Sequence, residues 1–187
     1  PSEDQVAITT GIRGIISCEV ELTGPRRDLH SGMYGGAVLN PLQALTELCA
    51  SLHNPDGRVN VPGFYDAVIE PVQWEKDELA RLPETEASLA ASIGVPALRP
   101  VQGRTPMEAI RYEPTLEFNG IGGGYQGEGD KTIIPARAFV KISCRLVADQ
   151  DPEDIRDKLF QTLRERCPQS VSLKITEGHH GDRKSVV

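Results

Sequence analysis

Positive charge is scarce in this sequence, which has 20 lysine and arginine residues against 27 acidic residues, a net charge of −7 and a pI of about 5.1. A protein that binds the phosphate backbone needs a basic surface, so we expect no nucleic-acid partner. No apolar run approaches the length of a membrane span, so we expect no membrane partner either. The 39% hydrophobic and 25% charged fractions are typical of a folded chain, and its 187 residues suffice for one large domain.

Closely spaced cysteines are also absent. The four cysteines lie far apart and form no C-x-x-C pair, which excludes a zinc ribbon and a thioredoxin-like redox motif. Each falls at an inward position of its local pattern, so we expect buried, reduced thiols. The expected location is cytoplasmic. Because the sequence begins at Pro1 and not at methionine, a missing signal peptide carries no weight in that expectation.

Motifs that would make the chain a catalyst by itself are missing. There is no H-E-x-x-H pattern. The adjacent His179 and His180 would point in opposite directions in an extended segment, so a surface turn is expected in preference to joint ligation of a metal. His53 falls at the end of a predicted helix, where a structural role with the helix dipole is expected. Ser31 lacks the G-x-S-x-G context of a nucleophile. We therefore predict that this chain binds no metal and is inactive alone.

A glycine-rich stretch resembles a nucleotide-binding loop only in its spacing. Gly122, Gly124 and Gly127 fit G-x-G-x-x-G, but a predicted strand follows them instead of the helix that would bind a pyrophosphate. The stretch is interpreted as a long connection between strands, or as a place where backbone approaches a ligand closely.

Hydrophobic periodicity predicts a six-element fold. Strands are expected over residues 15–24, 112–121, 138–148 and 170–178. Helices are expected from the Asn40 cap through Leu52 and from the Asp151 cap to residue 167. The order β-α-β-β-α-β predicts an α+β, ferredoxin-like split βαβ sandwich of two layers.

Residues 54–110 interrupt this order with seven prolines and are interpreted as a helical insertion after the first helix, with helices near 75–82 and 83–93. The first and last strands are expected side by side and antiparallel. The ends of the chain would then lie close together, as in a domain inserted into a larger protein.

His30 is the one candidate catalytic residue that the pattern itself suggests. It follows a strand and sits among small residues in "RRDLHSGMYGGAVLNP", where another backbone could approach it. An imidazole there could donate a hydrogen bond to a developing oxyanion. A loop histidine with a purely structural role fits the pattern equally well.

Three stretches carry a resemblance to a known family: "DLHSGMYGGAVLNP", "PTLEFNGIGGGYQGEGDKTIIPARAFVKISCRLV" and "PGFYDAV". They are similar to the lid, or dimerisation, domain of the zinc-dependent aminoacylase, glutamate carboxypeptidase and carnosinase-like dipeptidase family. The resemblance extends over residues 1–187 and implies a single lid domain excised from a two-domain peptidase.

The resemblance also implies the partners and cofactor. The expected partners are a second copy of the chain, its own catalytic domain and a small peptide substrate. Two zinc ions would be bound by that catalytic domain and none by this chain. His30 matches the lid histidine that stabilises the tetrahedral intermediate in the partner's active site. Thr132 matches a position that contacts polar substrate groups, and Arg145 matches the arginine that binds the substrate carboxylate.

Three alternatives stay open at this point. Arg145 could instead form a cross-strand ion pair with Glu117 or Glu19. The chain could be a free-standing ferredoxin-like module that binds a small ligand or regulates another protein. It could also serve dimerisation alone, without contacting substrate.

Overall fold

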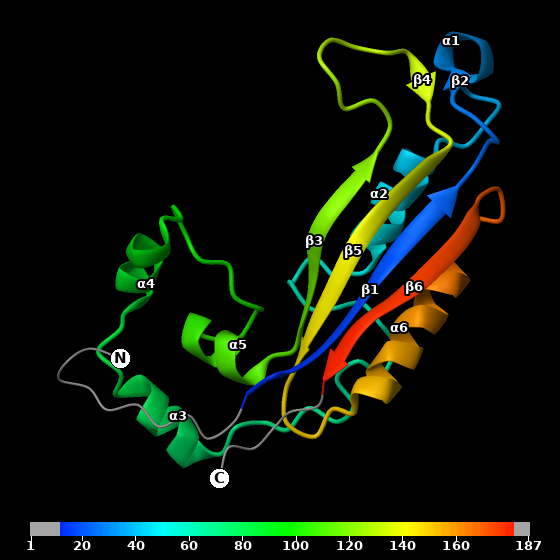
Figure 1. The fold of residues 1–187 in the computed structure, drawn as a ribbon. Coiled ribbons are helices and arrows are strands. Elements are labelled where there is room, and N and C mark those ends of the chain that lie inside the picture. Colours follow the sequence, from blue (N-terminus) through cyan, green and yellow to red (C-terminus); the bar gives the residue numbers. More distant parts are fainter. Residues whose placement is uncertain (1–11, 182–187) are drawn as a thin grey trace.

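The computed structural model describes residues 12–181 (Figure 1). The strands are β1 Gly14–Thr23, β2 Leu29–His30, β3 Thr115–Gly123, β4 Ile133–Ile134, β5 Arg137–Leu146 and β6 Ser172–Gly181. The helices are α1 Ser31–Tyr34, α2 Pro41–Ser51, α3 Gln73–Ala80, α4 Glu86–Ile93, α5 Pro106–Tyr112 and α6 Pro152–Arg166.

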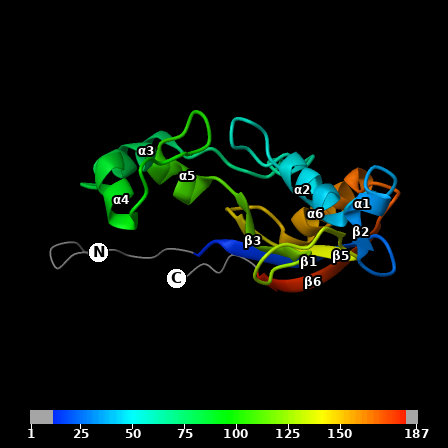
Figure 2. The ribbon, with the colours of Figure 1, turned by 90° about the horizontal axis from the view of Figure 1, so that it is seen from above.

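Four long strands form an antiparallel sheet in the order β3-β5-β1-β6. This is the strand order of the ferredoxin-like split βαβ fold, and β1 pairs with the last strand as the sequence predicted. Helices α2 and α6 lie on the same face of the sheet, which makes the two-layer sandwich visible from above (Figure 2). The predicted fold class is therefore confirmed.

The core lies between these two layers. In β1 and β5 every second residue is buried, as the alternation predicted, and α6 buries the expected stripe of Ile155, Leu159 and Leu163. Both predicted helix caps form: the side chain of Asn40 accepts from the N–H of Leu42, and that of Asp151 accepts from the N–H of Glu153.

The segment predicted as an insertion begins later than expected. Val59, Val61 and Phe64 are buried in the main core, so the chain leaves the two-layer body only after them. Helices α3 and α4 match the two predicted helices. Helix α5 was not predicted, although the sequence carries its signal: Thr105 and Glu108 form a capping box around Pro106.

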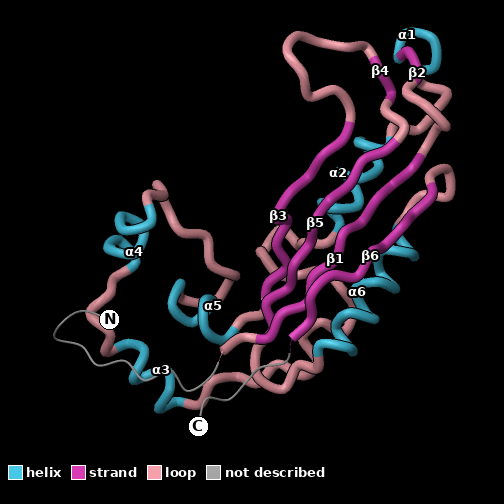
Figure 3. The backbone as a smooth tube through the Cα atoms, in the orientation of Figure 1, coloured by secondary structure: helices cyan, strands magenta, loops and turns pink. Residues whose placement is uncertain are grey.

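Helices α3 to α5 lie to one side of the sheet (Figure 3), and a charged network attaches them. Arg104 donates from Nε to Glu113 (2.6 Å) and from Nη1 to Glu70 (2.8 Å). Glu113 is only 2% exposed. The guanidinium of Arg13 donates to the main-chain oxygens of Glu113 (2.6 Å) and Ile110 (3.1 Å), so it joins the C-terminal end of α5 to β1.

All four cysteines are free, as predicted, and three of them are buried. Cys167 is only partly buried, because it lies at the end of α6. Burial raises the pKa of Cys49 to about 11 and that of Cys18 to about 12, so neither thiol is a ready nucleophile.

Two further expectations concern histidines. His53 has a structural role, but its partners lie on β3 and not at the helix end: Nε2 donates to the main-chain oxygen of Leu116 (3.0 Å), and the ring packs edge-on against Phe118. His179 and His180 were expected in a turn, but their backbone continues strand β6, and their side chains lie outside the described part. Within residues 12–181 no helix is long and apolar enough to cross a membrane.

Candidate functional site

His30 sits at one end of the sheet, where two short elements hold it. Its strand β2 pairs with β4, with Leu29 opposite Ile134 and His30 opposite Ile133. Immediately afterwards the chain turns into α1, and His30 is the N-cap residue of that helix. In Figure 1 this small unit stands beyond the end of the main sheet, beside the long β3–β4 connection. We call β2, α1 and β4 the His30 end of the molecule.

The cap fixes the tautomer of the imidazole. The main-chain N–H of Gly32 donates to Nδ1 of His30 over 3.0 Å. Because a backbone N–H can only donate, Nδ1 must be the unprotonated nitrogen, and the neutral ring carries its hydrogen on Nε2. That Nε2–H lies 3.4 Å from Oγ1 of Thr132. The distal nitrogen is thus a hydrogen-bond donor, held only loosely by its neighbour.

Small residues around His30 are required by this arrangement. A Cβ at Gly32 would lie 2.9 Å from Cε1 and 3.1 Å from Nδ1 of His30. A Cβ at Gly35 would lie 2.5 Å from the main-chain oxygen of Ser31. The glycines that follow the histidine in the sequence therefore keep space for its ring and for the tight turn.

Thr132 is brought next to His30 by the backbone. The N–H of Ser31 donates to the main-chain oxygen of Thr132 (2.9 Å), and the carboxylate of Asp28 accepts from the N–H of Ala136 (2.8 Å). Asp28 therefore ties the His30 loop to the segment before β5. It was not among the predicted site residues, although its position two residues before the histidine, in a turn-forming stretch, is a signal for such a role.

The side chains of His30 and Thr132 are both exposed to solvent. Among residues 12–178, whose side chains are described, no three His, Cys, Asp or Glu residues gather as metal ligands would. The His30 end therefore presents exposed hydrogen-bonding groups, and no cluster of metal ligands accompanies them among those residues.

Arg145 lies at the opposite end of the sheet. It is exposed near the end of β5, where it pairs with Ile15 and Thr115. It lies eight residues beyond Arg137 along the strand, which corresponds to about 27 Å. The structure thus brings together two of the three predicted site residues, His30 and Thr132, and separates the third from them.

The alternative partners of Arg145 are engaged elsewhere or do not reach it. Glu19 lies 3.7 Å from Lys141, and Glu117 is opposite Ser143 in the sheet. In the described part of the chain, Arg145 takes part in no ion pair. Its main-chain oxygen is 3.4 Å from Nη2 of Arg13, a residue that the sequence analysis did not mark. Among residues 12–181, the side chain of Arg145 therefore has no ionic partner that would compete with an external anion.

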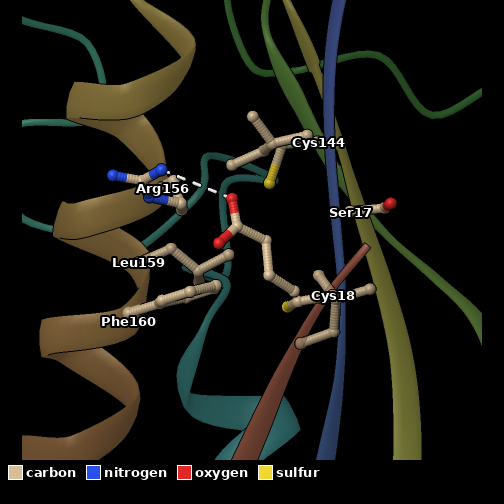
Figure 4. A pocket seen from close by; sticks show the side chains of 9 residues that line it. Ser17, Cys18, Cys144, Arg156, Leu159 and Phe160 are labelled. Carbon is tan, nitrogen blue, oxygen red and sulfur yellow. Dashed lines mark hydrogen bonds and ion pairs between the residues drawn. The ribbon is translucent and has the colours of Figure 1, made fainter. Parts of the chain in front are cut away.

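An enclosed pocket between the sheet and α6 is too small to be a ligand site. It holds about 10 Å³ and is lined by Cys18 and Cys144 of the sheet and by Leu159 and Phe160 of α6 (Figure 4). Arg156 and Glu177, which also line it, form an ion pair of 3.3 Å.

 A volume of that size accommodates at most a single water molecule.

Comparisons with known proteins agree with this picture. The family model described as "Peptidase dimerisation domain" matches residues 10–171. The Cys-Gly metallodipeptidase dug1 of Schizosaccharomyces pombe is 34% identical over 167 residues, which is 85% of this chain and 35% of that protein. The human Beta-Ala-His dipeptidase is 31% identical over 165 residues, 88% of this chain and 32% of that protein.

The solved structures agree as well. The crystal structure of human carnosine dipeptidase 1 superposes with a TM-score of 0.86 and 26% identity, covering 97% of this chain and 39% of that one. This chain thus spans about a third of the length of the relatives it matches. Since the family model covers most of its residues, the chain belongs to the peptidase dimerisation domain family, whose matched relatives here are metallodipeptidases.

Proposed function

We propose that this chain is the lid and dimerisation domain, residues 1–187, of a longer dipeptidase that hydrolyses dipeptides or N-acyl amino acids as a homodimer. The family match and the dipeptidase relatives, each about three times as long as the matched region, support this proposal. The lid would be joined to a catalytic domain of the same polypeptide. The free cysteines agree with the cytoplasmic location expected for it.

His30 would act on the substrate through its distal nitrogen. The observation that carries this role is the hydrogen bond from the Gly32 N–H to Nδ1, which leaves Nε2–H as a donor. An exposed, preorganised donor of this kind is what a developing oxyanion requires, and Thr132 adjoins it as a second polar contact for the substrate. The weak 3.4 Å contact between the two is easily replaced by a bond to the substrate.

Arg145 would hold the substrate carboxylate, because a free guanidinium pairs with a carboxylate through two parallel hydrogen bonds. One lid cannot bring Arg145 and His30 to the same dipeptide, since about 27 Å of strand separates their ends of the sheet. We therefore propose that each active site takes Arg145 from one subunit and His30 with Thr132 from the partner subunit. Dimerisation then becomes a requirement of catalysis.

Zinc does not fit the described residues of this chain, which contain no cluster of three ligand side chains. The two zinc ions of the proposed enzyme would be bound by its catalytic domain. The lid would contribute hydrogen bonds and exclude water, and alone it would be inactive.

The alternative of a free-standing ligand-binding module has less support, because the relatives that match this chain are dipeptidases of which it spans only about a third. A module that serves dimerisation alone would leave the cap on His30 and the free Arg145 side chain without a function.

The role of His30 is tested by His30→Ala in the full-length protein. Removing one oxyanion donor is expected to lower kcat about 100- to 1,000-fold with little change in KM. The position of the residue across the dimer is tested by mixing subunits. His30→Ala subunits are combined with subunits whose catalytic domain is inactivated, and activity should return only in the mixed dimers. Near-normal turnover by His30→Ala would reject the role, and mixed dimers without activity would reject its action across the interface.

A further inference from the structure

An open groove of about 710 Å³ lies between α3, α5 and the end of the sheet that carries Arg145. Four apolar side chains on its walls are more than half exposed: Ile12 (51%), Ile69 (60%), Trp74 (66%) and Ile110 (51%). Isolated exposed apolar residues are common on proteins, but several that line one groove mark a surface that another protein covers.

The walls of the groove are held in place. Glu70 lies on one wall, and Arg104 links it to Glu113 at the end of α5. Arg13 lies in the groove and donates to the main-chain oxygen of Ile110. The apolar side chains are therefore presented by a preformed surface, which lowers the entropy lost when a partner binds.

The position of the groove indicates which partner covers it. Ile12 leads into β1, and Ile15 pairs with Gly181 at the end of β6, so the chain enters and leaves the sheet beside the groove. In a protein three times as long, the remaining polypeptide connects at this end. The His30 end, which would enter the partner subunit, is about 27 Å away at the other end of β5.

We propose that this groove docks the catalytic domain of the same polypeptide, with Trp74 as its central contact. The inference rests on the proposed function, because that function supplies the catalytic domain. The inference adds a defined interface between the two domains. It also explains why the single tryptophan of this sequence is two-thirds exposed when the chain is considered alone. Docking here also places the catalytic domain next to Arg145, since Arg13 contacts both the groove and the main chain of Arg145.

The test compares two isoleucines in the full-length protein. Ile69 lines the groove and is 60% exposed in this chain, whereas Ile93 lies on α4, outside the groove, and is 59% exposed. Ile69→Cys and Ile93→Cys are each treated with a maleimide under native conditions, with wild-type labelling as the background. Ile69→Cys should react at least about tenfold more slowly, the factor given by a docking equilibrium of about 1.4 kcal/mol. Circular dichroism confirms that each variant is folded.

A second variant identifies the contact and the occupant. Trp74→Asp, added to Ile69→Cys, should restore fast labelling while leaving Ile93→Cys unchanged. Equal labelling of the two single variants would overturn the proposal. Protection that disappears on dilution to the monomer would also overturn it, because a second copy would then be the occupant. The outcome is independent of the subunit-mixing assay, so the groove proposal and the role of His30 can fail separately.

Discussion

The two ends of the sheet hold their candidate site residues in different ways. At the His30 end, main-chain hydrogen bonds and glycines fix the histidine, and its side chain and that of Thr132 are exposed. At the Arg145 end, which comprises the start of β1, the end of β5 and helix α5, buried and half-buried charges form the network. One end should therefore be sensitive to added bulk, and the other to the loss of charge.

The largest effect is expected from Glu113→Ala at the Arg145 end. This change removes a carboxylate that is 2% exposed and leaves Arg104, which is 13% exposed, with Glu70 alone. Breaking a buried pair should lower the free energy of unfolding by about 3 kcal/mol, measured by chemical denaturation. Glu78→Ala, which breaks an exposed pair with Arg81, is the matched control and should change stability by less than about 1 kcal/mol. Equal losses of stability in the two variants would show that the buried pair contributes no more to the free energy of unfolding than the exposed pair does.

Arg145→Ala tests whether the same end also binds substrate. In the full-length enzyme, KM for dipeptides should rise about 10- to 100-fold, as expected for the loss of a hydrogen bond between charged groups. A dipeptide amide, which lacks the carboxylate, should be affected little. Lys141→Ala changes another exposed cation of β5 and serves as the control. The assignment is wrong if the acid and the amide lose affinity equally.

Gly32→Ala tests the sensitivity of the His30 end to bulk. The new methyl group would meet the imidazole at 2.9 Å and displace it, which should reduce kcat about tenfold without unfolding the protein. Gly120→Ala is the control, because a Cβ there meets no atom within 4 Å. Unchanged kcat in Gly32→Ala would show that the position of the ring is less restricted than the cap indicates.

The smallest expected effect is a pH dependence of stability, and it arises from Glu70 at the Arg145 end. Hydrogen bonding to Arg104 lowers the pKa of Glu70 from its ordinary value of 4.5. Because the pKa is lower in the folded state, the contribution of Glu70 to stability is present above pH 4.5 and disappears as the pH falls through the folded value. Denaturation of Glu70→Gln at several pH values should therefore differ from wild type at neutral pH and converge with it in acid. A difference that persists at low pH would contradict this.

Much of the fold could be predicted because it depends on local patterns. Alternating residues in β1 and β5 and the caps Asn40 and Asp151 were correct, since strand alternation and helix capping involve near neighbours. The short elements β2, α1 and β4 were missed, because two-residue strands exist only through their partners. The start of the insertion was predicted too early, at residue 54, because Phe64 lies in a proline-rich stretch of the sequence although its side chain packs in the core.

The sequence by itself determined the fold class, the family and the three candidate side chains, because these depend on periodicity and on short motifs. Only the tertiary structure decided how the candidates are grouped. His30 and Thr132 are 102 residues apart and meet through the pairing of β2 with β4. Thr132 and Arg145 are only 13 residues apart, but the extended strand β5 separates them in space. The physical reason is that a strand adds about 3.4 Å with every residue, while sheet pairing brings distant segments within hydrogen-bonding distance.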